Sequence, residues 1–507
     1  MFYKNLLNSK KTKEEDFTYD MLSSEQKVLE DDSTLKYKDA KIVYNFSSQD
    51  GALKTGFGFE ELKMPTNRNS LDSETLIPIS GTEVKSIWKL KWYDSSSAKI
   101  DKYYLFYFNN ENKVCYDNIL DTRIATNIIS STYTQTPYAT YYRKNGEDYL
   151  MLTGAGNGLM LISGSGIQQD ADAPEIISCC THYGKLFAIT AGNQGKLEYA
   201  DDMNVLNWSS EQTQDLDFSD GRGNLNKIVS FDDYLYIFRD FGITRVSIYG
   251  KNEEFSISHM YFSDSFIYPN TIAQSGDNIY FLTDSGLKVF NGASVKNIEL
   301  ETDELLKRCD NKNASATCFN GKYYLACRGD FKDNLSVGCE SYTNGYKNNL
   351  LFIYDLETHH IDLVRGVDIR QLLALTNPYK SKLVACFNNE HKGKIGQLSQ
   401  DGKIFGTALA SCIKFAKSDF GAPNKKKRIK SFLIQAKENC TVKIASEEKT
   451  QEFSISGSES IQRIKTNITG KIFSVGIKSS ASEKSISKFM LTLGKEWKQF
   501  TEIEFCW

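Results

Sequence analysis

The chain has 507 residues, of which 40% are hydrophobic, 25% are charged and 12% are aromatic. This composition excludes wholesale disorder and allows a large packed core, and the formal net charge of −3 gives no overall basic field for nucleic acid. No run of about 18 apolar residues is present, so we expect no membrane-spanning segment. Residues 1–20 lack an apolar stretch, so we also expect no secretory leader and folding in the cytoplasm.

The N-terminal 37 residues are rich in charge, and we expect them to form a loosely packed arm with at most a short helix. Short apolar runs separated by turns begin near residue 38. The first of these runs, Lys41–Phe46, precedes the repeats described next. We predict that it supplies a closing strand to the last repeat.

A repeated unit of strand, short turn, strand, glycine turn and strand then follows. Its two clearest copies are Ile228–Ile248 and Thr271–Phe290, and their equivalent residues Ile228 and Ile272 are 44 positions apart. Turns such as Asp-Asp, Gly-Asp and Asn-Gly separate the runs, as expected for tight hairpins. Repeats of about 40–50 residues built from such meanders are typical of propeller blades.

Candidate repeats begin near residues 85, 138, 175, 226, 270, 314 and 370. The sequence therefore predicts an all-β protein with a β-propeller of about seven blades, give or take one. From residue 409 to 505 the pattern changes to short strands that alternate apolar and polar residues, which favours a small C-terminal β-sandwich. The predicted organisation is an N-terminal arm at 1–37, a propeller at 38–405 and a sandwich at 406–507.

Motifs for catalysis or for metal binding do not stand out. The eleven cysteines include no CxxC pair and only five histidines are present, so we expect free, mostly buried thiols and no zinc site. We interpret His359–His360 as a polar turn, and the glycine-rich segment Gly154–Gly166 as a connection between strands. The sequence predicts no catalytic residues, no cofactor and no metal, and we expect no enzymatic activity.

Two side-chain groups are candidates for binding. The run Lys425-Lys426-Lys427-Arg428 is the strongest concentration of charge, and it is suited either to contact a DNA backbone or partner ring or to be a solvated strand start. A set of tyrosines is suited either to propeller packing or to stacking on sugars, and packing is the simpler interpretation. The set comprises Tyr103, Tyr104, Tyr107, Tyr141 and Tyr142.

Three stretches resemble tailed-phage virion proteins of the packaged-DNA-stabilisation (head–tail plug) and tail-nozzle type. Asp50–Gly58 resembles an early glycine- and arginine-containing element of that family, with Lys54 in place of its first arginine and Phe57 in place of its proline. Lys196–Trp208 is similar to a blade end with small polar residues before a tryptophan. Ser418–Arg428 is similar to the family's Asp-x-Gly-x-Pro element that precedes the C-terminal sandwich.

The resemblance covers roughly residues 38–507 in the order of its elements, although its motifs are degenerate. It implies a structural protein of a virion, synthesised in the host cytoplasm, that forms a homo-oligomeric ring around the DNA channel of the neck or tail. Such a ring would join head and tail or retain packaged DNA, contacting portal, adaptor or tail proteins and, through Lys425–Arg428, the DNA itself. Two alternatives stay open, a carbohydrate- or receptor-binding propeller and, ranked last, a propeller hydrolase.

Overall fold

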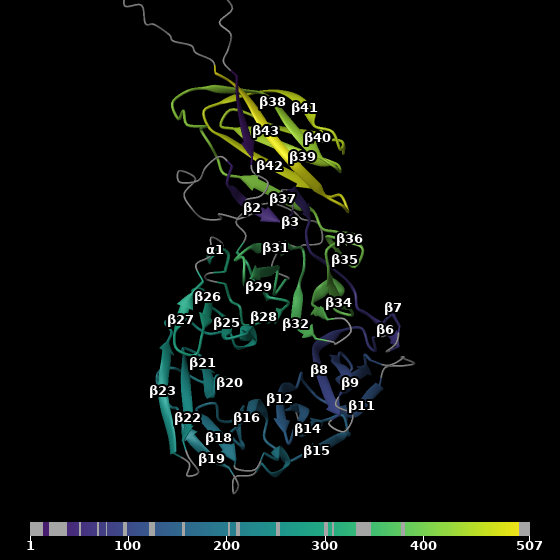
Figure 1. The fold of residues 1–507 in the computed structure, drawn as a ribbon, viewed down its shortest axis with the longest axis vertical. Coiled ribbons are helices and arrows are strands. Elements are labelled where there is room, and N and C mark those ends of the chain that lie inside the picture. Colours follow the sequence, from purple (N-terminus) through teal and green to yellow (C-terminus); the bar gives the residue numbers. More distant parts are fainter. Residues whose placement is uncertain are drawn as a thin grey trace, which may run out of the picture.

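A computed structural model gives the fold of the chain. It describes residues 14–19, 38–49, 52–67, 70–77, 79–94, 99–120, 127–154, 158–200, 203–208, 213–249, 254–298, 303–306, 309–330, 346–376 and 381–495. Seven antiparallel sheets stand in a ring, and a two-sheet sandwich lies beside the rim of that ring (Figure 1). The predicted all-β class, with a propeller of about seven blades and a C-terminal sandwich, is confirmed.

The first four blades each consist of four strands that are consecutive in the chain. Blade 1 contains β8 (Val84–Asp94), β9 (Lys99–Asn109), β10 (Lys113–Asn118) and β11 (Asn127–Thr132). Blade 2 contains β12 (Tyr138–Lys144), β13 (Glu147–Thr153), β14 (Leu159–Ile162) and β15 (Ile167–Asp170). Blade 3 contains β16 (Ile176–His182), β17 (Lys185–Thr190), β18 (Lys196–Ala200) and β19 (Gln214–Asp217), and blade 4 contains β20 (Leu225–Phe231), β21 (Tyr234–Arg239), β22 (Gly242–Tyr249) and β23 (Glu254–Phe262).

Blades 5 and 6 follow the same rule, whereas blade 7 borrows a strand. Blade 5 contains β24 (Ala273–Ser275), β25 (Asn278–Thr283), β26 (Gly286–Phe290) and β27 (Val295–Asn297). Blade 6 contains β28 (Ser315–Phe319), β29 (Lys322–Cys327), β30 (Leu350–Asp355) and β31 (Ile361–Arg365). Blade 7 contains β32 (Ile369–Leu375), β33 (Lys382–Phe387), β34 (Ile395–Ser399) and then β5 (Gly58–Glu61), which comes from the N-terminal part of the chain.

Short elements connect or cover these sheets. They are the hairpin β6 (Lys63–Asn67) and β7 (Ser70–Leu76), the small strands β35 (Lys403–Ile404) and β36 (Thr407–Ala408), the helical turn α1 (Asp303–Leu306), and the 3₁₀ turns η1 (Val205–Asn207), η2 (Pro269–Thr271) and η3 (Asn389–His391). Strand β35 pairs in parallel with β5 and so covers the outer edge of blade 7.

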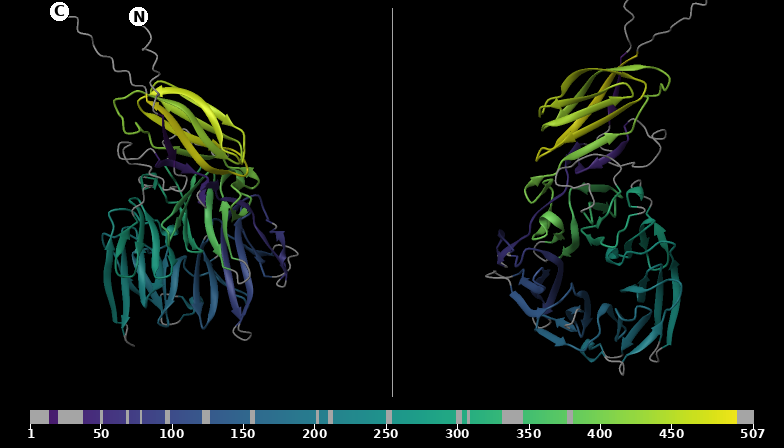
Figure 2. Two further views of the ribbon diagram at one scale, coloured as in Figure 1. Left: turned by 45° about the horizontal axis from the view of Figure 1, so that its top comes forward. Right: turned by 180° about the vertical axis from the view of Figure 1, so that it is seen from behind.

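The sandwich is built from both ends of the chain. One sheet contains β1 (Glu14–Tyr19), β3 (Phe46–Gln49), β4 (Ala52–Thr55), β38 (Lys427–Ala436), β41 (Gln462–Gly470) and β43 (Ser485–Lys495). The other contains β2 (Ala40–Tyr44), β37 (Ser411–Phe415), β39 (Cys440–Ser446), β40 (Thr450–Ile455) and β42 (Phe473–Ser479). Figure 2 shows the purple N-terminal strands lying among the green and yellow C-terminal ones.

The N-terminal part of the chain therefore differs from the sequence predictions. The predicted closing strand Lys41–Phe46 is wrong, because β2 pairs with β37 of the sandwich and β5 closes the ring. Strand β1 pairs with β43, whereas we predicted a loosely packed arm there. The predicted boundary at residue 38 is wrong in the same way, since residues 40–55 belong to the sandwich sheets. The physical reason is that a strand joins the sheet that buries its apolar face, and Tyr19, Val43 and Leu53 all pack in the sandwich core.

Two glycines make the passage from the sandwich into the ring possible. A Cβ on Gly56 would lie 2.6 Å from the backbone carbonyl of Asn45, and a Cβ on Gly58 would lie 2.1 Å from the carbonyl oxygen of Lys403. Only glycine allows backbones to approach so closely. Between them, Phe57 is buried against blades 6 and 7. This packing gives a physical reason for the glycines at the end of the Asp50–Gly58 element.

Asn45 ties the sandwich to the outer strand of blade 6. Its side-chain Nδ2 donates to the carbonyls of Arg365 (3.1 Å) and Ala410 (2.8 Å), and its Oδ1 accepts from the Arg365 amide (2.8 Å). Its own carbonyl accepts from the Ser411 hydroxyl at 2.6 Å. The Arg365 guanidinium, fully buried, lies 4.5 Å from the centre of the Tyr44 ring. The two domains are thus joined by buried, directional contacts.

A belt of hydrogen bonds links the blades around the ring. Each of the seven seams between neighbouring blades carries at least one bond from a side chain of one blade to the backbone of the next. In blade order these are Lys89 N to Tyr141 Oη, Cys179 N to Thr140 Oγ1, Ile228 N to Ser178 Oγ, Lys227 Nζ to Ile272 O, Tyr323 Oη to Thr271 O, Leu372 N to Ser315 Oγ, and Ile87 N to Gln371 Oε1. Except for Tyr323 of β29, the residues of the belt lie in or immediately before the first strand of their blade.

The seam between blades 7 and 1 offers a direct test of the belt. Gln371 accepts from the Ser86 hydroxyl (2.6 Å) and the Ile87 amide (3.0 Å), and it donates to the Ile87 carbonyl (2.8 Å). We expect Gln371→Ala to lower the free energy of unfolding by about 2 kcal/mol, because two backbone groups lose their partner. Hydrogen exchange at the Ile87 amide should speed up accordingly. The matched variant Gln274→Ala, on the exposed side of β24, should change neither, and equal effects from both variants would argue against the belt.

Candidate functional site

Of the predicted basic run, Lys425 and Lys426 lie in the turn that precedes β38, and Lys427 and Arg428 are the first two residues of that strand. Asp419 Oδ1 accepts from the Gly421 amide (2.8 Å) and Ser418 Oγ from the Phe420 amide (2.9 Å), so two side chains shape the turn. Phe420 and Gly421 both have a positive φ, of 50° and 72°. The Ser418–Arg428 element is therefore a folded turn that aims the chain into β38.

The Lys427 side chain stabilises this turn and does not lie on the surface. Its side chain is buried, and its Nζ donates to the carbonyls of Ala422 (2.6 Å) and Lys425 (3.0 Å). Burial lowers the pKa of Lys427, while Asp419 and Glu447 act in the opposite direction. An ammonium group held in this way is not presented to a DNA backbone.

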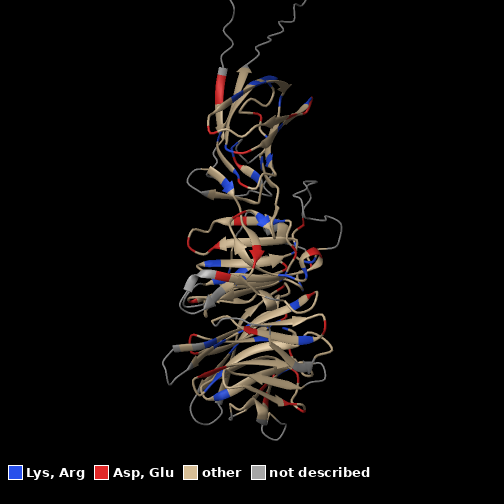
Figure 3. Ribbon diagram, turned by 90° about the vertical axis from the view of Figure 1, so that its right-hand side faces the viewer, with Lys and Arg blue, Asp and Glu red and all other residues tan. Residues whose placement is uncertain are grey.

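The rest of the run is not a uniform basic patch either. Lys426 forms an ion pair with Glu448 at 2.8 Å, and this hydrogen bond lowers the pKa of the Glu448 carboxyl. Arg428 is half-buried and Lys425 is exposed. In the view of Figure 3 basic and acidic residues are interspersed over both domains. Within the predicted run, Lys427 is therefore internal and Lys426 is ion-paired.

These positions predict a specific outcome for Lys427→Gln. Because the ammonium group holds two carbonyls of the turn, its loss should lower the free energy of unfolding by about 1–2 kcal/mol. Binding of a labelled DNA duplex in a filter assay should not change. The control Lys425→Gln, which removes the same charge from the exposed turn, should leave stability intact. A loss of DNA binding in Lys427→Gln without a loss of stability would contradict this structural role.

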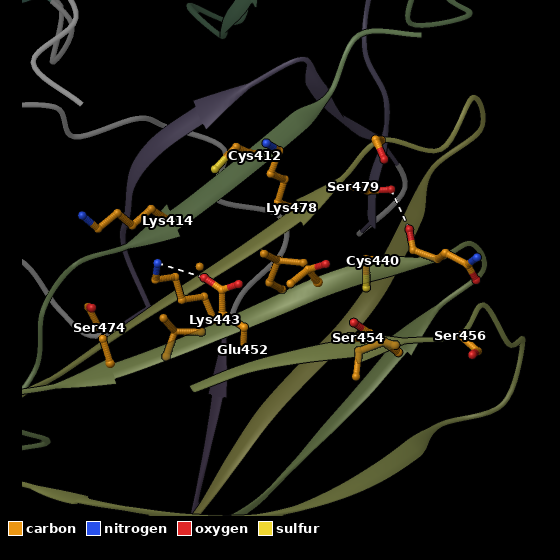
Figure 4. A pocket seen from close by; sticks show the side chains of 18 residues that line it. Cys412, Lys414, Cys440, Lys443, Glu452, Ser454, Ser456, Ser474, Lys478 and Ser479 are labelled. Carbon is orange, nitrogen blue, oxygen red and sulfur yellow. Dashed lines mark hydrogen bonds and ion pairs between the residues drawn. The ribbon is translucent and has the colours of Figure 1, made fainter. Parts of the chain in front are cut away.

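A groove on the outer face of the second sandwich sheet is the first hollow of note. We call it the sandwich groove; its volume is about 1000 Å³ and residues of β37, β39, β40 and β42 line it (Figure 4). Lys414, Lys443 and Lys478 stand above small side chains such as Ser454 and Ser474. The Lys443 ammonium is paired with Glu452 at 3.0 Å. The groove therefore has a mixed, partly compensated charge.

A second hollow lies on the innermost strands of blades 1 to 3 and on the neighbouring strand β13 of blade 2. We call it the axis pocket; its volume is about 380 Å³, and its polar lining comprises Lys89, Lys91, Tyr141, Arg143, Asp148 and Thr181. The first strand of every blade faces the ring axis (Figure 1). Together these seven strands contain Lys85, Lys89, Lys91, Arg143, Lys144, Lys227 and Arg370, against the single acid Asp94. Acidic residues are thus scarce on the axis-facing strands, which gives these strands a positive balance in a chain whose net charge is −3.

Sequence reasoning did not single out the axis pocket. Its basic residues lie on two blades, Lys89 and Lys91 on blade 1 and Arg143 on blade 2, so no run of charge marks them in the chain. The signal that was available is the placement of lysine and arginine on the first strand of several repeats. Of the tyrosine set, Tyr103, Tyr107 and Tyr142 are buried in the blades, and Tyr104 is half-buried, as packing requires. Tyr141 is 43% exposed and lines the axis pocket.

Other sequence candidates occupy structural positions. His359 lies in the β30–β31 hairpin with a positive φ of 62°, and its Nδ1 is 2.6 Å from the Tyr354 hydroxyl. The nine cysteines within the described ranges are free, and seven of them are buried. Within those same ranges no group of three or more His, Cys, Asp and Glu side chains is placed to hold a metal ion. No helix in the described part of the chain is long and apolar enough to span a membrane.

Comparisons with known proteins place the chain in no family. No family model matches it, and no curated protein matches it. Among solved structures, the Pan2 WD40 domain of Neurospora crassa is 10% identical over 64% of this chain and 90% of its own, with a TM-score of 0.38. A catalytically inactive virginiamycin B lyase from Staphylococcus aureus, with quinupristin, is 12% identical over 68% and 99%, with a TM-score of 0.41. BBS1N in complex with ARL6DN is 9% identical over 67% and 95%, with a TM-score of 0.39.

The class of the protein follows from its own sheets. Four-stranded antiparallel blades, seven seams with a hydrophobic core at each, and a strand from the N-terminal part completing the last blade define a seven-bladed β-propeller. The sandwich, with a core of its own, is the second domain. TM-scores of about 0.4 do not carry an activity or a ligand from the compared structures to this chain.

Proposed function

We propose that this protein is a structural, non-enzymatic component of a tailed-phage or prophage virion. In this role it forms part of a ring in the neck or tail, around the DNA channel, and either joins head and tail or retains packaged DNA. The observation that carries the proposal is the Ser418–Arg428 element. It resembles the element that precedes the sandwich in that family. In this chain it forms a turn that leads into β38, and hydrogen bonds from the side chains of Ser418, Asp419 and the buried Lys427 hold the turn in place.

The connection between the two domains supports the same proposal. A component of a neck or tail ring must hold its domains in a fixed relation while neighbours and DNA exert force on it. Asn45, Arg365 and Tyr44 provide such a connection through fully buried contacts. Strands from both ends of the described chain also pair within the sandwich. Because of this pairing, neither end can detach without disrupting the sandwich core.

The partners of the proposed ring are further copies of this chain and other virion proteins, of the portal, adaptor or tail kind. Electron microscopy of the purified protein tests the first of these, and mass spectrometry of purified particles tests the second. We expect ring-shaped oligomers and a constant copy number per particle. A protein that stays monomeric at high concentration and is absent from particles would overturn the proposal.

A further inference from the structure

The sandwich has an open edge at β41. This strand pairs with β38 on one side, and within the described chain no strand pairs with its other side. Its register with β38 is regular over residues 462–465. The outward amide and carbonyl groups of such an edge are able to bind a further strand, and proteins usually protect them. The edge of β41 is therefore a place where the sheet can be extended.

The core of the sandwich is incompletely covered beside this edge. Ile464 of β41 and Phe453 of β40 are only partly buried, and both pack against the core. Phe432 of β38 lies opposite Ile464 in the register, and its ring centre is 5.2 Å from that of Phe453. Ile461, directly before β41, is 47% exposed. A strand added here would bury further apolar surface if its inward-facing side chains were apolar.

The outward side chains of β41 are basic. Arg463 and Lys465 alternate with the inward Ile464, and both are exposed. The edge strands β40 and β1 differ from β41, because β40 exposes Glu452 and β1 exposes Glu15. Opposite charges on neighbouring strands attract and like charges repel. An added strand with acidic outward side chains therefore prefers β41 to the other two edges.

A segment with this pattern lies in the part of the chain that follows β43, outside the described ranges. Acidic and apolar residues alternate in Glu502-Ile503-Glu504-Phe505, and Trp507 continues the apolar series. In an extended chain the two acids point to one face and the three apolar side chains to the other. These two faces match the basic outward side and the apolar inward side of the β41 edge.

The segment is long enough to reach this edge. Strand β43 ends at Lys495, which pairs with Lys427 of β38, and Lys427 pairs with Gly470 at the end of β41. The ends of β43 and β41 thus lie at the same end of the sheet. At about 4.8 Å per strand and about 3.3 Å per residue, the path past β41 and back to the level of Lys465 measures about 22 Å. An extended chain from Lys495 to Glu504 spans about 30 Å.

We propose that residues 502–507 bind to the β41 edge of their own chain and run antiparallel to β41, with Glu504 opposite Lys465 and Phe505 opposite Ile464. The apolar face of the segment then covers the open part of the core, and its acids lie beside the basic side chains of the edge. A short connection keeps the segment close to this edge, which favours binding within one chain. This inference does not rest on the proposed virion role.

Cysteine cross-linking of the full-length protein tests where the segment binds. Lys465→Cys and Glu504→Cys, combined in one chain, place two thiols opposite each other, and mild oxidation should join them. We expect a disulfide within one chain, seen as a monomer on a non-reducing gel and identified by mass spectrometry of the joined peptides. Each single variant is the control for the native thiols. The absence of this disulfide, or a disulfide that joins two chains instead, overturns the proposal.

Charge reversal provides a second measurement. Glu504→Lys places like charges opposite each other, so it should weaken binding of the segment and speed hydrogen exchange in residues 462–465 about fivefold. Combining it with Lys465→Glu restores opposite charges and should restore slow exchange. Lys488→Glu is the matched control, because Lys488 is exposed on β43 and not at the edge, and it should exchange as the wild type does.

Thermal unfolding of each charge variant verifies that it is folded. The proposal is overturned if Glu504→Lys leaves exchange in β41 unchanged, if the combined variant exchanges as fast as Glu504→Lys alone, or if Lys488→Glu speeds exchange equally.

Discussion

Replacing Asn45 with glycine should lower the free energy of unfolding by about 3 kcal/mol, the cost of leaving buried backbone groups without partners. The side chain is 1% exposed and bridges the carbonyls of Arg365 and Ala410 and the amide of Arg365. Glycine accepts the backbone φ of 59° at no cost, so this variant isolates the lost hydrogen bonds. Alanine should cost about 1 kcal/mol more, because a Cβ is strained at that φ.

Calorimetry and hydrogen exchange measure this effect. We expect a lower unfolding temperature and faster exchange at the Arg365 amide, which marks the seam between blade 6 and the sandwich. Asn145 is the matched control, because it has a φ of 51° in an exposed hairpin. Asn145→Gly should leave both measurements close to those of the wild type. If Asn45→Gly unfolds at the same temperature as the wild type, the two domains are held together by other contacts.

The blades are readable in the sequence because each repeat carries its own local signals. The predicted starts near 138, 175 and 314 lie within one residue of the observed strands at Tyr138, Ile176 and Ser315. Apolar runs of about six residues, as in Tyr234–Arg239, are bounded by turns such as Asp232–Asp233, where both residues have a positive φ. Strand, turn and next strand are neighbours in the chain, so short-range patterns suffice to place them.

The interleaving of the two ends depends on contacts that no short window contains. Val43 of β2 faces Ile413 of β37, about 370 positions later, and the pattern of β2 alone suits either a blade or a sandwich. The closing strand β5 is only four residues long, and it is specified by the close approach of Gly58 to Lys403. Non-local pairing of this kind is determined by packing, which is why the predicted closing strand was placed on the wrong segment.

The candidate sites differ in predictability for a related reason. A run such as Lys425–Arg428 is conspicuous in the chain, yet the turn before β38 draws Lys427 inward and pairs Lys426 with Glu448. The lining of the axis pocket comes from strands of blades 1, 2 and 3 that are separated in the chain, so the pocket forms only when these blades pack together. Charge density along a sequence is therefore a poor guide to charge density on this molecule.

Replacing Gly58 with alanine should cost at least about 3 kcal/mol, because overpacking against backbone is not relieved by a change of rotamer. The added Cβ would lie 2.1 Å from the carbonyl oxygen and 2.6 Å from the amide nitrogen of Lys403. Strand β5 pairs with β34 on one side and β35 on the other, so moving β5 away from the clash breaks the pairing that closes the ring. We expect a lower unfolding temperature and faster hydrogen exchange in β34.

Two further variants make this expectation specific to ring closure. Gly476→Ala is the matched control, because Gly476 also lies in a strand and its nearest contact would be an ordinary 3.4 Å to the Ile413 carbonyl. It should cost less than about 1 kcal/mol. Phe59→Ala leaves the backbone of β5 unstrained but removes a fully buried ring packed edge-on against Phe387, and it should cost about 3–5 kcal/mol with the same exchange pattern in β34. If Gly58→Ala and Phe59→Ala leave exchange in β34 unchanged, blade 7 stays closed without β5, and the N-terminal strand does not close the ring.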